Sequence, residues 1–428
     1  MPAKNKKSKN KKIPKLRFPE FSGAWEERRL GEVGDIITGT TPPTAERDFY
    51  GDEFMFISPA DIGNKRYIRD TKNKLSKLGF GYGRGVRKNA TLFVCIGSTI
   101  GKVAQADRDC STNQQINSIE SNKNNLDDFI FYRLLNDSKK IKLLAGTQAV
   151  PQLNKTQFSS LKFCFPILKE QQKIAGFLGG VDEWIENLRA EKEKMEEYKK
   201  GMMQKIFDFS CHSRAGGNPE NCIRFKDDNG KNFPDWEEKG LGEIKVFVSD
   251  GNYGEMYPKA SEMKDTGVPF IRANNIKDLK VVWDDMKYIG SDLHKMLQSG
   301  HLKKGDILVT TRGEIGMLAY VDEEFDDANI NAQICLLRCG NDILPRFLLN
   351  YLSSRIGQKQ FKELQTGSAL KQLPKGNLSK IKINLPSLPE QQKIAEFLTS
   401  LDNLIELKEK QITQAEEWKK GLMQGLFV

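Results

Sequence analysis

Apolar side chains recur at alternating spacings of three and four residues along two long segments, residues 170–207 and 390–427. This spacing predicts two amphipathic helices, each roughly 60 Å long at about 1.5 Å per residue. Polar residues such as Glu191 and Lys408 interrupt each stripe near its middle. Two similar stripes in one chain favour antiparallel pairing of the helices over packing of each stripe on its own domain. The predicted seam comprises Ile174, Phe177, Val181, Trp184, Leu188, Ile394, Phe397, Leu401, Leu404 and Trp418.

The two helical segments are copies of one another. EQQKIAGFLGGVD from Glu170 recurs as EQQKIAEFLTSLD from Glu390, and the offset stays constant to the end of both segments (390 − 170 = 427 − 207 = 220). Further upstream, WEERRLGEV from Trp25 matches WEEKGLGEI from Trp236, whereas the stretches between such landmarks differ. The chain is therefore a tandem duplication in which a scaffold repeats around variable parts.

Upstream of each helix, short runs of β-forming residues alternate with Gly-, Asn- and Asp-rich turns. Strands are expected at 54–57, 91–96, 307–311 and 334–337, and short helices at 126–135 and 345–352. The predicted fold class is α/β (α+β), with two tandem mixed α/β domains separated by two long helices that pair as an antiparallel coiled coil with pseudo-twofold symmetry. The predicted segments are a basic disordered tail (1–17), a first domain (18–166), a first long helix (167–207), a linker or insertion (208–232), a second domain (233–386) and a second long helix (387–428).

Length, charge and cysteine content narrow the class of protein. A chain of 428 residues should form more than one domain, and 38% hydrophobic residues suffice for folded cores. The net charge of +10 has the sign expected of a protein that binds a polyanion. Seven scattered cysteines do not resemble a disulfide framework, and no run of about 18 apolar residues is present to span a membrane. We therefore expect a cytoplasmic protein without membrane contact.

Near-matches to catalytic motifs are better explained as structural features. GSTIGK, residues 97–102, has three residues between its glycines where a phosphate-binding loop has four, so a tight turn between strands is expected. PDWEEK, residues 234–239, lacks the separated acidic residues of a metal-dependent nuclease. Cys211, His212 and Cys222 lack a fourth metal ligand, and three histidines leave little material for a histidine centre. We expect no catalytic residue, no metal and no bound cofactor.

Loops rich in glycine, basic residues and amides occur in both halves and offer groups for DNA binding. Arg and Lys can contact phosphates or guanine edges, and Asn and Gln can pair with adenine. Any one of these residues could instead be a turn or surface group, so their clustering in both halves carries the argument. The candidates are Arg84, Arg87, Lys88, Asn113, Gln114, Gln115, Lys155, Arg272, Asn274, Asn275, Lys303, Lys304, Arg312, Asn331, Gln333 and Lys371.

Taken together, these motifs resemble the specificity subunits of Type I restriction-modification systems. The resemblance rests on PEQQKIAEFLTSLD from Pro389, its twin KEQQKIAGFLGGVD from Lys169, the helix endings KKGMMQKIF and KKGLMQGLF, and the two WEE motifs. It covers nearly the whole chain after the basic tail. Gln171, Gln172, Gln391 and Gln392 in these motifs are expected to organise the helix starts rather than to touch DNA.

The resemblance implies a sequence-specific DNA-binding subunit that is not itself an enzyme. Each half would be a target-recognition domain that reads one part of an asymmetric, split sequence in double-stranded DNA. The paired helices would fix the distance between the parts, and their seam would dock two modification (methyltransferase) subunits, which restriction (translocase/nuclease) subunits join. Those partners would carry the chemistry of S-adenosylmethionine, ATP and Mg²⁺, and this chain would bind none of them.

Two other interpretations stay open. The chain could be an orphan or methyltransferase-only specificity subunit, or a coiled-coil adaptor whose globular ends bind proteins instead of DNA. A linear fall of log affinity with log salt on duplex DNA would argue against the adaptor.

Overall fold

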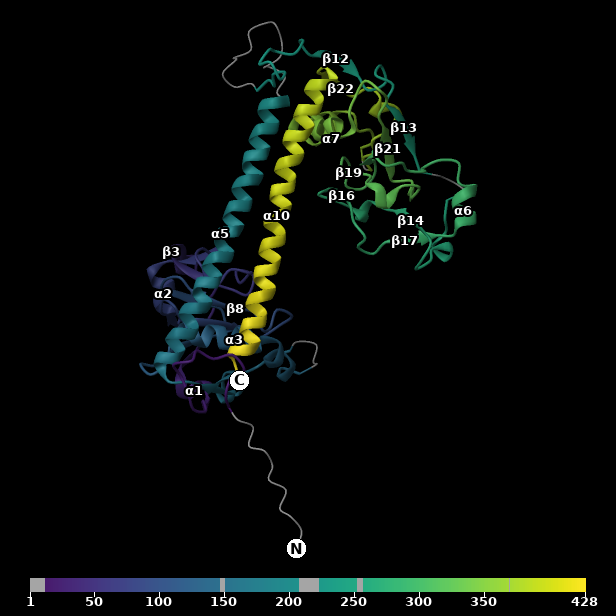
Figure 1. The fold of residues 1–428 in the computed structure, drawn as a ribbon. Helices are drawn as coiled ribbons and strands as arrows, with labels where there is room; N and C mark the ends of the chain where they lie inside the picture. Colours follow the sequence, from purple (N-terminus) through teal and green to yellow (C-terminus); the bar gives the residue numbers. More distant parts are fainter. Residues whose placement is uncertain (1–11, 147–150, 208–222, 252–256, 369) are drawn as a thin grey trace. The chain divides into compact units, whose positions relative to one another are not determined.

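Two long helices, α5 (Leu168–Phe207) and α10 (Leu388–Leu426), occupy the segments in which the sequence predicts them (Figure 1). The computed structural model describes residues 12–146, 151–207, 223–251, 257–368 and 370–428. The chain divides into two compact units, one of Met1–Arg189 with Lys410–Val428 and one of Ala190–Glu409. Each unit therefore combines one α/β domain with about half of each long helix. The sequence analysis treated each long helix as a single segment, whereas the boundary between the units falls inside both helices.

The first unit contains a five-stranded sheet of order β2-β10-β7-β8-β4, a four-stranded sheet of order β5-β3-β9-β6 and a two-stranded pair of β1 with β11. Its strands are β1 (Glu26–Arg29), β2 (Gly34–Thr38), β3 (Tyr50–Ile57), β4 (Tyr67–Ile68), β5 (Asn73–Leu75), β6 (Gly85–Val86), β7 (Thr91–Val94), β8 (Val103–Ala106), β9 (Cys110–Thr112), β10 (Ile116–Ser121) and β11 (Lys162–Phe165). Its short helices are α1 (Leu30–Val33), η1 (Arg47–Phe49), α2 (Lys77–Tyr82), α3 (Asp127–Leu144) and α4 (Lys155–Ser160).

The second unit repeats this plan with a six-stranded sheet of order β13-β21-β18-β19-β16-β15, a three-stranded sheet of order β17-β14-β20 and the pair β12 with β22. Its strands are β12 (Glu237–Gly240), β13 (Phe247–Asp250), β14 (Val268–Ile271), β15 (Ile276–Lys277), β16 (Leu279–Val281), β17 (Lys287–Ile289), β18 (Ile307–Thr310), β19 (Leu318–Tyr320), β20 (Asn329–Ile330), β21 (Ile334–Arg338) and β22 (Lys382–Leu385). Its short helices are η5 (Ala260–Glu262), η6 (Ala273–Asn275), α6 (Ser291–Met296), η7 (Glu323–Phe325), α7 (Pro345–Ser353), α8 (Arg355–Glu363) and α9 (Lys375–Leu378).

The central strands of the two large sheets, β7 and β18, are buried along their whole length. Their sequences, TLFV and ILVT, lack the polar alternation of a half-exposed strand because both faces are covered. The strands predicted from such runs are confirmed with slightly different ends. The helix expected at 126–135 is longer than predicted and forms α3, whereas the helix expected at 345–352 is α7.

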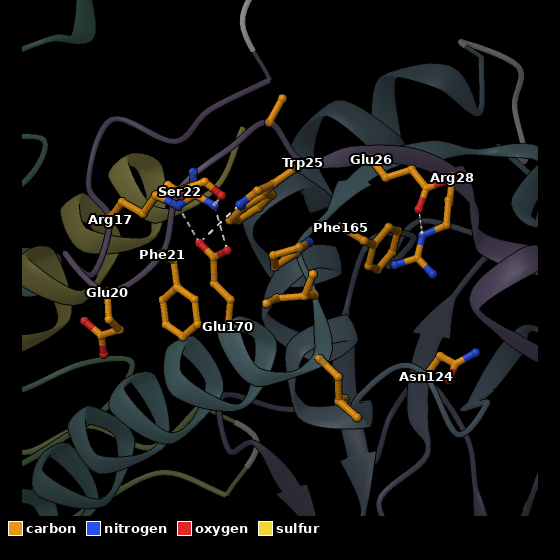
Figure 2. Close-up of a pocket in the computed structure, with 14 residues that line it drawn as sticks. Arg17, Glu20, Phe21, Ser22, Trp25, Glu26, Arg28, Asn124, Phe165 and Glu170 are labelled. Carbon is orange, nitrogen blue, oxygen red and sulfur yellow. Dashed lines mark hydrogen bonds and ion pairs between the residues drawn. The ribbon is translucent and has the colours of Figure 1, made fainter.

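A buried glutamate near the start of α5 ties this helix to its domain. Arg17 donates from Nε and Nη2 to the two carboxylate oxygens of Glu170, each at 2.8 Å, and Trp25 Nε1 donates to the same carboxylate at 3.2 Å (Figure 2). The three side chains line one pocket together with Phe165 at the end of β11. A buried carboxylate is tolerable only when it is paired and hydrogen-bonded, so Glu170 requires both partners.

The second unit builds the same anchor at the start of α10. Arg224 donates to the two oxygens of Glu390 at 2.8 and 3.0 Å, and Trp236 Nε1 donates at 2.9 Å. The residue that follows each glutamate, Gln171 or Gln391, donates to the carbonyl of the proline before the helix, at 2.9 Å in both cases. The prediction that these two glutamines organise the helix starts is confirmed.

Residues 12–17 and 223–232 are packed on folded elements, although the sequence analysis placed them in a disordered tail and a linker. Leu16 N donates to Gly425 O at 2.9 Å, and Ile223 N donates to Lys205 O at 3.3 Å, so each segment contacts the end of a long helix. The physical reason is that these segments supply the arginines that pair with the two buried glutamates.

The long helices run antiparallel where they pair within each unit. In the first unit Val181, Ile185 and Leu188 of α5 pack with Ile412 and Ala415 of α10. Ion pairs flank this seam and join Arg189 to Glu416 and Lys419 to Asp182. In the second unit the polar residues that interrupt the stripes are partners, because Lys408 Nζ lies 2.6 Å from Glu191 Oε2. The predicted antiparallel pairing is confirmed.

The residues of the predicted seam differ in burial. Ile174, Val181, Leu188 and Ile394 are buried, and Phe397 and Leu401 are partly buried. Phe177, Trp184 and Trp418 are largely exposed, and their rings meet between the two helices at the edge of the contact. Leu404 is also exposed. Periodicity missed Ile185 and Ile412, which are buried in the helix–helix contact.

Replacing Glu170 with alanine should lower the free energy of unfolding by roughly 3 kcal/mol, because the Arg17 guanidinium would keep its burial and lose its carboxylate. Urea denaturation followed by circular dichroism measures the change. The control is Glu27→Ala, since Glu27 forms exposed ion pairs with Lys12 and Lys162 and its loss should leave the midpoint unchanged. Equal effects of the two substitutions would contradict the anchoring role.

Candidate nucleic-acid interface

In the first unit, four loops meet at one end of the five-stranded sheet. β2 and β7 run antiparallel to β10, so the ends of β2 and β7 lie beside the start of β10. The loops at this end are residues 39–41, 95–101, 113–115 and 151–153, which we call the first loop cluster. The last of them belongs to the cluster because Leu153 N donates to Cys95 O at 2.8 Å.

The second unit presents the equivalent loops. β13 and β18 run antiparallel to β21, so their ends lie beside the start of β21. The loops at this end are residue 251 and residues 311–316, 331–333 and 371–373, which we call the second loop cluster. Leu373 N donates to Thr311 O at 2.9 Å, as Leu153 donates to Cys95 in the first unit.

Each cluster contains a tight turn held by two glycines in the left-handed region, where a Cβ would be strained. Their φ angles are 96° at Gly97, 94° at Gly101, 74° at Gly313 and 88° at Gly316. Lys102, the lysine of the phosphate-loop near-match, donates to the carbonyl of Ile62 at 2.7 Å. Its ammonium is thus engaged by backbone, and the structure confirms a turn between strands.

Each cluster also contains a turn shaped by its own amides. Asn113 Nδ2 donates to Gln115 Oε1 at 3.0 Å, and Gln115 N donates back to Asn113 Oδ1 at 3.1 Å. Asn331 and Gln333 repeat both bonds at 3.3 and 3.1 Å. These four residues were predicted to pair with adenine, whereas in the structure their amides hold the turn.

The two clusters carry different residues at equivalent positions. Bridges between Ile96 and Gln152 and between Arg312 and Gln372 show that Ile96 and Arg312 occupy equivalent positions. At the amide turn, the middle residue is Gln114 in the first unit and Ala332 in the second.

Sequence comparison of the halves missed the role of Ile96. Matching Ile100-Gly101 with Ile315-Gly316 places Gly97 opposite Arg312. The backbone bonds that close the turns run from Gly101 to Val94 and from Gly316 to Thr310, so the second turn is one residue shorter. Each turn needs glycine at its two positions of positive φ. An alignment of the halves on both glycines of each turn could have corrected the register.

Several of the predicted contact residues, besides Gln333 of the amide turn and Asn274, are exposed in or beside a loop cluster. They are Arg84, Gln114, Lys155, Arg312 and Lys371. Arg84 reaches the first cluster because its Nη1 donates to Thr38 O, at the end of β2, at 3.1 Å. Arg272 and the exposed Asn274 follow β14, whose last carbonyl, that of Ile271, accepts the N–H of Asn331 at 3.0 Å. Both therefore lie beside the second cluster.

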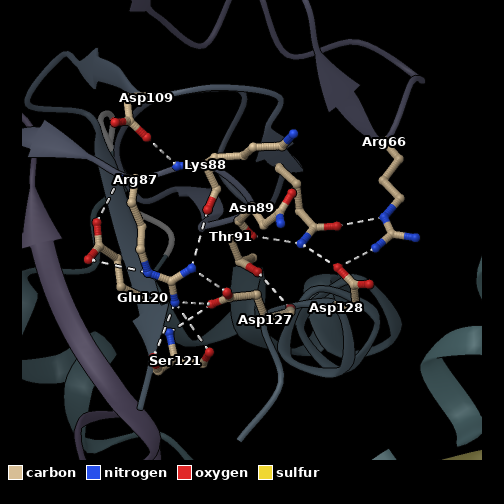
Figure 3. Close-up of polar contacts among 11 residues, drawn as sticks. Arg66, Arg87, Lys88, Asn89, Thr91, Asp109, Glu120, Ser121, Asp127 and Asp128 are labelled. Atoms are coloured by element: carbon tan, nitrogen blue, oxygen red, sulfur yellow. Dashed lines mark hydrogen bonds and ion pairs between the residues drawn. The ribbon is translucent and has the colours of Figure 1, made fainter. Parts of the chain in front are cut away.

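The remaining basic candidates lie elsewhere. Arg87 and Lys88 precede β7, and Lys303 and Lys304 precede β18, which places all four at the other end of the central strands. Arg87 is held by Asp127, whose two oxygens accept from Nη1 and Nη2 at 2.6 and 3.0 Å (Figure 3). Lys304 pairs with Glu323. Asp127 therefore engages the Arg87 guanidinium within the domain, and the role of Arg87 as a DNA contact stays a prediction.

Asn275 is also structural. Its side chain is fully buried and donates to the carbonyl of Asp284 at 2.7 Å, while its Oδ1 accepts from Arg272 N at 3.1 Å. Arg272 in turn donates from Nη2 to Asp285 Oδ2 at 2.9 Å. The amide thus fixes the loop after β14, and it cannot reach a base edge.

The described thiols are unsuited to act as nucleophiles. Burial raises the pKa of Cys95, Cys110, Cys335 and Cys339 to about 12, so these groups stay protonated at neutral pH. Cys211, His212 and Cys222 lie outside the described residues. Among the described helices, none combines the length and the apolar character needed to cross a membrane.

A family model described as the Type I restriction modification DNA specificity domain matches residues 23–197 and 234–417. The chain is similar to the MjaVIII specificity subunit of a Type I restriction enzyme from Methanocaldococcus jannaschii, at 27% identity over 433 residues that cover 97% of this chain and 94% of the relative. It is also similar to the EcoBI specificity subunit of a Type I restriction enzyme from Escherichia coli, at 26% identity over 323 residues that cover 74% of this chain and 67% of the relative.

Solved structures share the fold. A crystal structure of a Type I restriction-modification S subunit from M. genitalium aligns with a TM-score of 0.55 at 19% identity and covers 97% of this chain and 99% of that chain. A chain from a structural study of complex assembly and conformational transition in a Type I system aligns with a TM-score of 0.57 at 18% identity and covers 94% and 97%. The predicted two-domain fold with paired long helices is thus confirmed.

Two neighbouring asparagines separate structural from surface roles. Asn275→Ala should lower the free energy of unfolding by about 2 kcal/mol, because buried backbone groups lose the amide that satisfies them. Asn274→Ala, at the adjacent exposed position, should change it by less than about 0.5 kcal/mol. Thermal and urea unfolding of the two variants side by side measures the difference, and similar stabilities would refute the assignment of Asn275.

Proposed function

Because this chain belongs to the Type I restriction modification DNA specificity domain family, we propose that it reads a bipartite, asymmetric sequence in double-stranded DNA, with one half-site for each unit. It is a specificity subunit, which is the non-catalytic component of a Type I restriction-modification system. The support for two different half-sites, one read by each unit, comes from the residues of the loop clusters.

The observation that carries the proposal is a duplicated scaffold with different tips. Both clusters use the same glycine turn, the same amide turn and the same bridge to a later loop. At equivalent positions the first unit has the partly buried Ile96 and the exposed Gln114, and the second has the exposed Arg312 and the partly buried Ala332. Arginine suits a guanine edge and glutamine suits an adenine edge, so two such tips select different bases.

Phosphate contacts would add affinity and fix the register of each unit. Exposed Lys155 and Lys371 flank the tips of the first and second cluster, and the chain carries a net charge of +10. Since both units belong to one chain, binding of one half-site makes binding of the second effectively intramolecular. A split target is thereby read with high affinity although each half is short.

The exposed aromatic side chains on the long helices suit docking of the modification subunits. Trp418 contacts Trp184 and Phe177 edge to face, with ring centroids 6.3 and 6.4 Å apart. Trp184 and Trp418 are 46% and 49% exposed. Solvent-exposed clusters of large apolar groups mark interaction surfaces in soluble proteins.

The second unit carries the repeat counterparts of this aromatic cluster. Leu404 corresponds to Trp184 and Tyr198 to Trp418, and both are exposed. Two equivalent surfaces support the docking of two modification subunits, which restriction subunits would join. In this proposal those partners bring S-adenosylmethionine, ATP and Mg²⁺, and the complex acts on DNA in the cytoplasm.

The decisive experiment maps DNA methylation in cells that express this chain with its cognate modification subunit. We expect a split, asymmetric methylated motif that disappears when this chain is absent. Arg312→Ala should relax one base pair of one half-site, with a loss of discrimination of about 1–3 kcal/mol, and Gln114→Ala should relax the other half-site. The spacer between the halves should stay unchanged in both variants.

Two results would overturn this reading. A motif altered in both halves by either substitution would refute the assignment of one half-site to each unit. The absence of any new motif despite a soluble complex would favour an inactive specificity subunit or a protein-binding adaptor.

Docking can be tested separately. Replacing Trp184 and Trp418 together with serine should reduce the number of bound modification subunits from two to one, as measured by native mass spectrometry, because the repeat surface with Leu404 stays intact. The control is Leu143→Ser, since Leu143 is an exposed apolar residue on α3 and belongs to neither long helix. Full occupancy in the tryptophan variant would show that these side chains are not the contact.

A further inference from the structure

Two of the three histidines of the chain, His294 and His301, lie together in the second unit. Their ring centroids are 4.4 Å apart. Asp327 completes a group in which one ligand atom from each residue lies within 4.8 Å of the other two. His294 Nε2 is 3.3 Å and His301 Nδ1 is 3.9 Å from Asp327 Oδ1. The carboxylate therefore lies between two imidazole nitrogens.

A hydrogen bond fixes the tautomer of His301. Its Nε2 lies 2.8 Å from the carbonyl oxygen of Leu297, and because a carbonyl only accepts, this nitrogen carries the proton. In the neutral ring Nδ1 then holds a lone pair, which faces the carboxylate of Asp327. A ring N–H bound to a backbone carbonyl is the arrangement that orients histidine ligands in metal sites.

His294 is short of partners for a buried histidine. Its side chain is 7% exposed, and its Nδ1 is buried without a hydrogen-bond partner among the described residues. A hydrogen bond from Nε2 to Asp327 would satisfy one ring nitrogen and leave the other as an orphan. An ion bound at Nε2 would hold the ring in this position, while Nδ1 would keep its proton and stay without a partner in the described part of the chain.

The three residues come from separate elements, so their meeting is a tertiary feature. His294 lies in α6, His301 precedes β18, and Asp327 follows η7 just before β20. The second loop cluster begins after β20, which places the histidines at the other end of this strand. β20 has only two residues, and Gly300, next to His301, lies close to Gly251 of the second loop cluster, so the group borders this cluster.

The first unit lacks this group although its backbone is equivalent. Gly85 pairs with Ser111 there as His301 pairs with Asn329 in the second unit. Near the same point Asp109 accepts the N–H of Lys88 at 2.8 Å, so its carboxylate is used within the domain. The histidines are thus an addition to the scaffold of the second unit, and the scaffold itself does not require them.

We propose that His294, His301 and Asp327 bind one transition-metal dication of the Zn²⁺ class, with water in the remaining coordination position. Two imidazoles and a carboxylate suit Zn²⁺, Co²⁺ or Ni²⁺ better than Mg²⁺ or Ca²⁺, which prefer oxygen ligands. Metal–ligand bonds of about 2.0–2.2 Å bring tetrahedral ligand atoms to roughly 3.4 Å from one another. The two histidine–aspartate distances are 3.3 and 3.9 Å, and all three ligand atoms lie within 4.8 Å of one another, so small side-chain movements would close the site around an ion. The ion joins α6 to the segments that precede β18 and β20 and so stabilises the second unit.

The test uses the full chain after removal of metal with EDTA and titration with Co²⁺, followed by visible absorption. We expect one equivalent of Co²⁺ per chain, displacement by Zn²⁺, and a higher melting temperature in the presence of either ion. His301→Gln and Asp327→Asn should each weaken Co²⁺ binding by at least about tenfold. Asp327 is 78% exposed, so its conservative replacement keeps the domain folded.

His212→Gln is the matched control, because it removes the third histidine and should leave Co²⁺ binding unchanged. The proposal is overturned if the unaltered chain binds no Co²⁺, or if binding survives both His301→Gln and Asp327→Asn. Loss of binding in His212→Gln alone would equally overturn it. These measurements need no DNA, so their outcome is independent of the proposed reading of a split target.

Discussion

The structure depends on two buried carboxylates, Glu170 and Glu390, each near the start of a long helix. A buried charge must be compensated, and each glutamate takes an arginine and a tryptophan that lie far away in sequence. Trp25 and Trp236 open the two domains, so the carboxylates fix the position of each domain on its helix. The segments that carry Arg17 and Arg224 are held for the same reason, and each also contacts the end of the other long helix.

A rigid frame of this kind allows the loop clusters to vary. The glycines and amides that shape each cluster satisfy one another, so the backbone of a turn does not depend on the residue at its tip. A scaffold that repeats while its tips change fits a protein whose two halves read two different sequences.

The long helices carry more apolar surface than their pairing needs. The seam in the first unit is narrow and is completed by ion pairs at its edges, which leaves Phe177, Trp184 and Trp418 exposed. Exposed apolar surface lowers the solubility of a protein, and a docked partner would cover this surface. The same helices can thus hold the chain together on one face and present a surface for other subunits on another.

The sequence by itself determined the duplication, the two long helices, their antiparallel pairing and the family, because these depend on periodicity and on repeated motifs. It also placed Gln114 and Arg312 in loops, where exposure follows from local turn chemistry. Tertiary structure alone decided which polar groups hold the fold together. Arg87 and Asn275 are residue types that often contact DNA. In the structure Asp127 pairs with Arg87, and backbone carbonyls accept hydrogen bonds from Asn275. These partners lie on other elements. His294, His301 and Asp327 show the converse, since residues without any shared motif meet only when three elements pack. Spacing along the chain cannot reveal such partners, because burial and pairing depend on contacts between distant segments.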